Sequence, residues 1–188
     1  MNLPNKLTLL RILLVPLFVL FLLVNSIPFN YLWALLIFIG ASVTDFFDGY
    51  YARKYNMVTD FGKFADPLAD KILVTSAFCC FIQLGIIGAV PVIIVLFREF
   101  AVTSVRLIAA TKGTVVAANM WGKAKTVSQI VAIIATIFFK LLVQFGLTIA
   151  EPIFNVIIAV CIWVSVLLTI ISGVVYLKDN ADLYKNCK

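Results

Sequence analysis

The chain has 188 residues, of which 63% are hydrophobic, and its mean hydropathy is +1.11. Such a composition is too apolar for a soluble core and is typical of an integral membrane protein. Fifteen Lys and Arg against nine Asp and Glu give a net charge of +6, and the absence of histidine excludes histidine-based catalysis and histidine metal sites. The four cysteines have no metal-ligand spacing.

Runs of about 20 apolar residues predict transmembrane helices. Six such runs follow one another along the chain, at 8–24, 28–51, 66–84, 89–110, 126–146 and 152–177. A backbone in lipid must satisfy its own hydrogen bonds, and helices do so within one segment. We therefore expect an all-α integral membrane protein with six transmembrane helices, formed by residues 1–188 as a single domain.

Basic residues gather at the two ends of the chain and around the connections between the second and third runs and between the fourth and fifth. The other connections lack Lys and Arg, although Lys140 lies near one of them. The positive-inside rule then predicts that both termini are cytosolic. The positive charge would face anionic lipids of a plasma membrane, so it does not indicate nucleic acid. Since no small-residue cleavage site follows the first run, a cleaved signal peptide is not expected.

Five of the nine acidic residues lie between Asp45 and Asp70. Asp45 and Asp48 are spaced i, i+3, and Asp66 and Asp70 i, i+4, so each pair falls within roughly 40–60° on one helix face. Carboxylates at a membrane are costly unless they are hydrated, paired or bound to metal. The alternative is that they are solvated or paired with Lys and Arg. Two matched pairs instead favour a site for hard divalent cations such as Mg²⁺.

Small residues accompany the carboxylates on both helices. Gly49 and Ala52 continue the face of Asp45 and Asp48, and Gly62 precedes Asp66 by four residues. They leave room for a diphosphate to approach the backbone, and Arg53 is available to pair with a phosphate. Asp60 falls off this spacing and is expected to cap a helix or to be solvated.

The segment matches a known signature, D-x-x-D-G-x-x-A-R-x8-G-x3-D-x3-D, at every position from Asp45 to Asp70. On these residues the chain resembles the CDP-alcohol phosphatidyltransferases. The resemblance implies transfer of a phosphatidyl group from CDP-diacylglycerol to an alcohol, with release of CMP. It also implies a homodimer, a site for two divalent cations (Mg²⁺ or Mn²⁺) held by four aspartates, and a CDP pocket. The metal site would be Asp45, Asp48, Asp66 and Asp70, with Asp70 also the general base, and the CDP pocket would be Gly49, Ala52, Arg53 and Gly62.

Two further segments bear on the acceptor alcohol. The segments REFAVTSVR (98–106) and WGKAKT (121–126) supply four cations that suit a phosphate monoester: Arg98, Arg106, Lys123 and Lys125. The alternative is that these residues only set topology, although Arg98 lies deep in its run, beside Glu99. Together with the opening NLPNKLTLLR, the segments are similar to bacterial phosphatidylglycerophosphate synthases. This resemblance implies glycerol 3-phosphate as acceptor and a bacterial plasma membrane location; serine, inositol phosphate and phosphatidylglycerol remain alternatives.

The opening segment itself carries polar residues before the first apolar run. Asn5 and Arg11 either anchor an interfacial helix at the lipid headgroups or help to close the nucleotide pocket. A cation transporter is the alternative from another functional class, because carboxylates within a membrane often mark ion paths. It predicts acidic residues on several helices near mid-membrane, whereas here they cluster toward one face.

Overall fold

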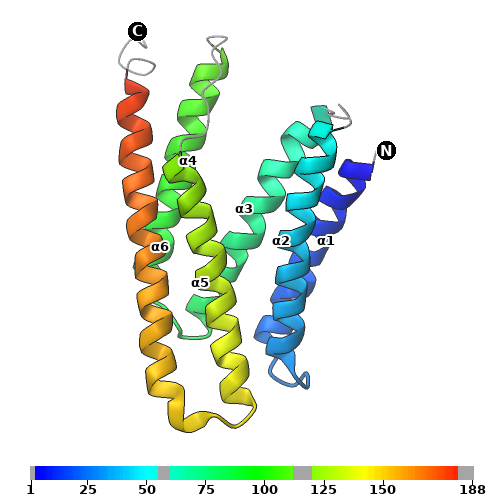
Figure 1. Cartoon of the computed structure of the whole chain (residues 1–188), viewed down its shortest axis with the longest axis vertical. Helices are drawn as coiled ribbons and strands as arrows, with labels where there is room; N and C mark the ends of the chain where they lie inside the picture. Colours follow the sequence, from blue (N-terminus) through cyan, green and yellow to red (C-terminus); the bar gives the residue numbers. More distant parts are fainter. Residues whose placement is uncertain (1–2, 55–59, 112–119, 182–188) are drawn as a thin grey trace.

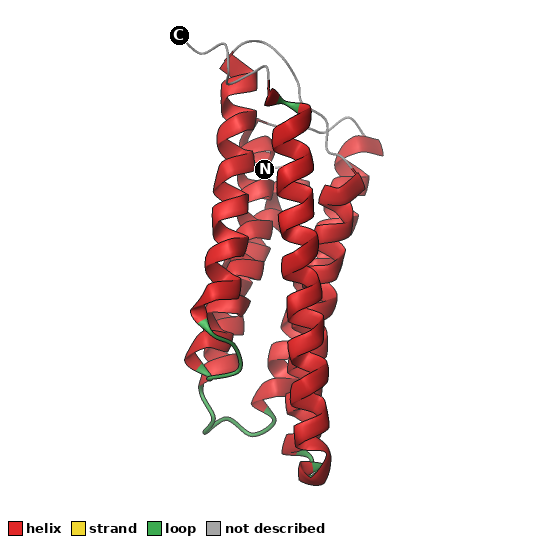
Figure 2. Cartoon of the chain, turned by 90° about the vertical axis from the view of Figure 1, so that its left-hand side faces the viewer, coloured by secondary structure: helices red, strands yellow, loops and turns green. Residues whose placement is uncertain are grey.

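The computed structural model describes an all-helical bundle (Figures 1 and 2). Its backbone is described for residues 3–54, 60–111 and 120–181, and within these ranges the side chains of 3–5, 45–54, 60–67 and 70 are outside the description. The described residues form six α-helices and one 3-10 turn: α1 (Leu3–Leu23), α2 (Asn30–Lys54), α3 (Asp60–Gln83), α4 (Ala89–Thr111), α5 (Met120–Gln144), η1 (Thr148–Ala150) and α6 (Glu151–Asp179). The predicted number of helices is confirmed.

The helices divide into two groups that lie side by side (Figure 1). In the first group, α1 packs against α2 and α3; in the second, α6 packs against α5 and α4. Contacts of α2 with α5, and smaller ones of α3 with α4 and α5, join the groups. The helix ends that precede and follow the α2–α3 and α4–α5 connections lie at the same end of the bundle as the start of α1 and the end of α6. This arrangement agrees with an even number of membrane crossings.

Three of the described helical segments are long and apolar enough to cross a membrane: Lys6–Leu23, Met120–Gln144 and Thr148–Asp179. Asn30–Thr44 and Lys71–Gln83 are shorter apolar stretches, because α2 and α3 carry their charged residues toward their shared end. In α4, Arg98 and Glu99 interrupt the apolar sequence near its middle. Large apolar side chains such as Leu13 and Phe97, 71% and 74% exposed, point out of the bundle, as lipid-facing residues do.

The core extends through both groups and consists of aliphatic, aromatic and small side chains. Phe18 and Phe38 are fully buried with their ring centroids 5.6 Å apart, which fixes α1 on α2. Ala34 and Ala41 of α2 are also fully buried. Helices in lipid gain little from apolar burial alone, so small side chains that permit close backbone approach stabilise their packing.

Two connections at the opposite end of the bundle depend on glycine. Gly85, with φ 69°, follows α3, and the amide of Ile86 donates to the carbonyl of Phe81 at 2.9 Å. Gly146, with φ 99°, follows α5 in a similar way. A residue in this left-handed conformation satisfies the last carbonyls of a helix, and glycine adopts it without steric cost. These turns hold α3 on α4 and α5 on α6 and leave the other end for the candidate site.

Candidate active site

The signature residues lie on α2 and α3, two helices that contact one another. Asp45 and Asp48 belong to the last turns of α2, and Asp66 and Asp70 to the first turns of α3. These two helices contact one another, and their charged ends lie at one end of the bundle (Figure 1). The side chains of these aspartates, and of Gly49, Ala52, Arg53, Gly62 and Asn5, lie outside the described residues, so their roles stay predictions.

A cluster of charges centred on Glu99 lies immediately beyond the signature. The Nζ of Lys71 lies 3.8 Å from one carboxylate oxygen of Glu99, and Nη1 of Arg98 donates to the other at 3.1 Å. Lys125 of α5 also donates to this second oxygen. Three cations from α3, α4 and α5 therefore surround one carboxylate, and the cluster, which we call the Glu99 cluster, keeps a net positive charge.

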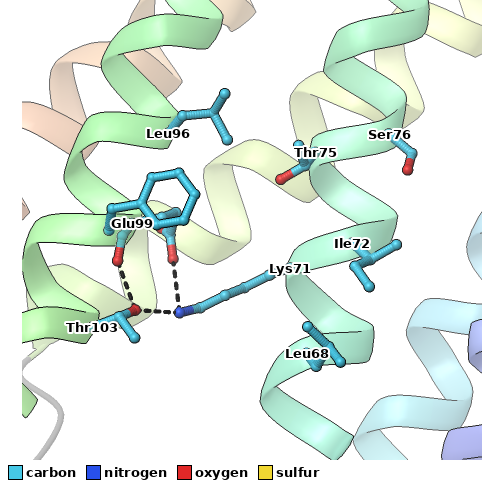
Figure 3. Close-up of a pocket in the computed structure, with 9 residues that line it drawn as sticks. Leu68, Lys71, Ile72, Thr75, Ser76, Leu96, Glu99 and Thr103 are labelled. Carbon is cyan, nitrogen blue, oxygen red and sulfur yellow. Dashed lines mark hydrogen bonds and ion pairs between the residues drawn. The ribbon is translucent and has the colours of Figure 1, made fainter. Parts of the chain in front are cut away.

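The Glu99 cluster is shielded from solvent. The side chains of Lys125, Arg98 and Glu99 are 8%, 12% and 16% exposed, whereas that of Lys71 is 38% exposed. Lys71 crosses from α3 to α4, where its ammonium also donates to the hydroxyl of Thr103 at 2.5 Å (Figure 3). Since Lys71 directly follows Asp70, the cluster begins one residue from the last aspartate of the signature.

A cavity of about 470 Å³ opens between α3 and α4 beside this cluster. Leu68, Ile72 and Leu96 line its apolar part, and Lys71 and Glu99 lie on its polar side (Figure 3). A cavity with an apolar wall and a cationic edge suits an amphipathic molecule whose polar end is anionic.

The other proposed phosphate ligands are arranged less uniformly. Arg106 reaches α6, where its Nε donates to the hydroxyl of Tyr176 at 3.3 Å and its guanidinium carbon lies 5.6 Å from the ring centroid. Lys123 is exposed on α5. The structure therefore brings Arg98 and Lys125 together on Glu99, adds Lys71, and places Arg106 and Lys123 elsewhere on the same helices.

Comparison with known proteins identifies the family. The model of the CDP-alcohol phosphatidyltransferase family matches residues 1–175. The chain belongs to this family. It is 44% identical, over 98% of its own length and 97% of the relative's, to the CDP-diacylglycerol–glycerol-3-phosphate 3-phosphatidyltransferase of Bacillus subtilis. It is also similar to a protein of that name from Rickettsia bellii, at 37% identity over 94% of each chain. A third relative is the probable phosphatidylglycerophosphate synthase of Mycobacterium tuberculosis, at 41% identity over 93% of this chain and 79% of the relative.

Membership of the CDP-alcohol phosphatidyltransferase family makes the protein an enzyme of the membrane. The family resemblance read from the aspartate signature is thereby confirmed. Among the residues whose side chains the structure describes, no group of acidic, histidine or cysteine side chains could hold a metal ion.

Sequence reasoning missed several residues of this transferase that the structure brings to the site. Lys71 was not assigned to the site, and Ser172 and Tyr176 of α6 were not considered. Thr8 and Arg11 of α1 are 0% and 1% exposed, and neither is without a partner. A fully buried arginine requires compensation for its lost hydration. Arg11 was expected at the lipid headgroups or at the nucleotide pocket, so its burial, and not its presence in this segment, is what the structure adds.

Removing the central carboxylate should destabilise the bundle. Glu99→Gln leaves Lys125 and Arg98 shielded from water without their counter-charge, a change that typically costs about 3–5 kcal/mol. We expect a clearly lower unfolding temperature in detergent, followed by tryptophan fluorescence. The control is Glu151→Gln, because Glu151 pairs with Lys140 at 3.1 Å but is 40% exposed, and such pairs contribute about 0–1 kcal/mol. Equal shifts for the two variants would contradict a structural role of the Glu99 cluster.

Proposed function

We propose that the protein transfers the phosphatidyl group of CDP-diacylglycerol to glycerol 3-phosphate, giving phosphatidylglycerophosphate and CMP. The observation that carries this proposal is the 44% identity, over nearly the full length of both chains, to a relative named for this reaction. The family model supports the phosphatidyl transfer, and the names of the relatives support the acceptor.

The signature aspartates are proposed to hold two divalent cations, Mg²⁺ or Mn²⁺. The donor set fits: Asp45, Asp48, Asp66 and Asp70 offer only carboxylate oxygens, which hard cations prefer. The contact between α2 and α3, which carry these residues, supports their convergence. Bound cations would neutralise charge on the diphosphate and on the CMP leaving group.

The remaining roles on α1, α2 and α3 follow from the same signature. Gly49, Ala52 and Gly62 are proposed to let the CDP diphosphate approach the two helices closely. Arg53 and Asn5 are proposed to bind the nucleotide by hydrogen bonds, with Arg53 supplying a bidentate phosphate contact. Asp70 is proposed to take the proton of the acceptor hydroxyl, so that the freed oxygen attacks the β-phosphorus of CDP-diacylglycerol.

The acceptor phosphate is proposed to bind Arg98 and Lys125 of the Glu99 cluster, together with Arg106 and Lys123 of the same two helices. Two observations support this position. Three cations share one carboxylate, so the cluster keeps positive charge for a dianion. In addition, Lys71, which lies at the edge of the cavity, directly follows the proposed base Asp70 in the chain. The phosphate would hold glycerol 3-phosphate with its primary hydroxyl toward Asp70.

The cellular setting is proposed from charge and family. The basic residues flank the end of the bundle where the signature lies, so the positive-inside rule places the active site at the cytosolic face of a bacterial plasma membrane. Residues 1–188 are proposed to act as one domain, and the protein to function as a homodimer.

An acceptor panel tests the proposed function against its alternatives. Purified protein is mixed with CDP-diacylglycerol, Mg²⁺ or Mn²⁺ and, in turn, glycerol 3-phosphate, serine, inositol phosphate or phosphatidylglycerol, and CMP release is measured. We expect release with glycerol 3-phosphate. Preference for another alcohol would overturn the acceptor but not the family. A cation transporter would release no CMP with any acceptor.

Neutralising Arg98 should impair use of glycerol 3-phosphate selectively. Loss of one charge-assisted contact costs about 1.5–3 kcal/mol, or roughly 10- to 150-fold. We therefore expect Arg98→Gln to lower kcat/KM for glycerol 3-phosphate by this factor, with the KM for CDP-diacylglycerol nearly unchanged, and Arg106→Gln to act in the same direction. Lys140→Gln is the control, because Lys140 pairs with Glu151 at the opposite end of the bundle. An unchanged dependence on glycerol 3-phosphate would contradict this assignment.

A further inference from the structure

Helix α6 carries a buried polar face although it is the most apolar of the membrane-spanning helices. The face comprises Ser165, Thr169, Ser172 and Tyr176, spaced i, i+4, i+7 and i+11, and each is no more than 2% exposed. Buried hydroxyls in a membrane bundle need hydrogen-bond partners. The partners that each residue finds therefore show what it does in the fold.

The two halves of this face are used differently. Ser165 donates to the carbonyl of Ile162, and Thr169 donates to the carbonyl of Ser165, both at 2.7 Å and both within α6. Ser172 instead accepts a hydrogen bond from Nη2 of Arg98 at 2.7 Å. Tyr176 accepts one from Nε of Arg106. Ser172 and Tyr176 thus bind two arginines of α4, whereas Ser165 bonds within α6 and Thr169 also accepts from Nε2 of Gln129 on α5 at 3.3 Å.

Gly173 lets Arg98 lie directly against the backbone of α6. A Cβ atom added at Gly173 would lie 2.9 Å from Cγ of Arg98, which is closer than real Cβ contacts. Cγ belongs to the stem of the side chain and cannot move without moving the guanidinium. An alanine at this position must therefore displace Arg98.

Arg98 is consequently fixed at three points before any substrate arrives. Its Nη1 is held by Glu99, its Nη2 by Ser172, and its stem by Gly173. Its Nε is buried and has no hydrogen-bond partner among the described residues, so this donor is available to a ligand. An arginine ordered in advance loses little side-chain entropy when it binds an oxyanion.

We propose that Ser172, Gly173 and Tyr176 of α6 are positioning residues that orient Arg98 and Arg106 for the phosphate of the acceptor. The inference rests on the proposed function and deepens it, because it adds residues of α6 to an acceptor site whose proposed phosphate ligands lie on α4 and α5. These three residues act through the arginines and need not touch the substrate themselves.

The test compares matched variants of the full-length protein. Ser172→Ala is paired with Ser165→Ala, which removes an equally buried hydroxyl that bonds only within α6. Gly173→Ala is paired with Gly40→Ala, where an added Cβ meets nothing within 4 Å. Initial rates give the KM for glycerol 3-phosphate at saturating CDP-diacylglycerol, and the KM for CDP-diacylglycerol at saturating glycerol 3-phosphate. We expect Ser172→Ala and Gly173→Ala to raise the KM for glycerol 3-phosphate roughly five- to tenfold, with the KM for CDP-diacylglycerol unchanged, and the controls to match the wild type.

A double-mutant cycle separates positioning from general stability. If Ser172 acts only through Arg98, adding Ser172→Ala to Arg98→Gln should raise the KM for glycerol 3-phosphate no further, whereas a structural effect would add to it. If Ser172→Ala does not purify as a monodisperse protein, the cycle is run on the second pair instead. It then combines Tyr176→Phe, which removes only the hydroxyl, with Arg106→Gln.

The outcomes distinguish this inference from the proposed function. A wild type that releases no CMP with glycerol 3-phosphate overturns both. An active wild type in which Ser172→Ala behaves like Ser165→Ala, or in which the cycle is additive, overturns the positioning role alone. A selective rise in the KM for glycerol 3-phosphate that disappears in the Arg98→Gln background supports it.

Discussion

Replacing Asp45 or Asp66 by asparagine should abolish turnover while the protein remains folded in detergent. Asparagine has nearly the shape of aspartate but no charge, so the site would lose the affinity on which two closely spaced divalent cations depend. CMP release measures turnover. The rise in unfolding temperature on adding Mn²⁺ measures binding separately, because a ligand at 100 times its Kd stabilises a folded protein by about 2.7 kcal/mol. We expect both signals to be lost.

Asp60→Asn is the matched control for these substitutions. Asp60 also lies in α3 but falls off the spacing shared by Asp66 and Asp70. This variant should keep both its turnover and its Mn²⁺ response. In the wild type, EDTA should stop CMP release, and added Mg²⁺ or Mn²⁺ should restore it. Full activity in excess chelator would refute a metal-dependent mechanism.

The number and order of helices could be read from apolar runs, but several helix starts could not. The run beginning at residue 66 belongs to a helix that starts at Asp60, and the run beginning at residue 126 to one that starts at Met120. A hydropathy pattern detects only the part of a helix that suits lipid. Helices α3 and α5 begin in polar sequence at the charged end of the bundle, where hydrogen bonding within the helix continues although hydropathy falls.

Several charged residues of the site were predicted from the sequence, but the pairs that they form with one another were not. Lys125 was expected at a phosphate pocket, and it is found on Glu99, which lies 26 residues earlier in the chain. Lys71 was not predicted at the site, yet it spans from α3 to α4. Local spacing determines which residues share a helix face. Which faces meet depends on how α3, α4 and α5 pack, and no short-range pattern encodes that.

The polar face of α6 also shows that local spacing does not reveal which helix a side chain will contact. The spacing of Ser172 and Tyr176 was visible in the sequence, but serine and threonine in an apolar helix commonly bond to their own backbone. Thr169 does so. Only the neighbouring helix α4 distinguishes Ser172 from such a residue, since Arg98 lies within hydrogen-bond distance of it.

Asp70→Asn should lower kcat by roughly 10²- to 10⁴-fold, the usual effect of removing a general base. Asparagine cannot accept the proton of the glycerol 3-phosphate hydroxyl, so the attacking oxygen stays protonated at the moment of transfer. Rates are measured at saturating Mn²⁺, because Asp70 is also a proposed metal ligand and weaker binding would otherwise add to the loss. The Mn²⁺-dependent unfolding temperature of the same variant reports how much binding remains.

An acceptor that needs less help from a base distinguishes the two roles of Asp70. Fluorine beside the attacking hydroxyl of glycerol 3-phosphate lowers the pKa of that hydroxyl, so more of it is deprotonated without a protein base. If Asp70 is the base, this analogue should regain part of the rate lost by Asp70→Asn, while Asp66→Asn should regain none. The acidic limb of the pH–kcat profile should also flatten in Asp70→Asn. Near-normal turnover of Asp70→Asn at saturating metal would assign the base to another group.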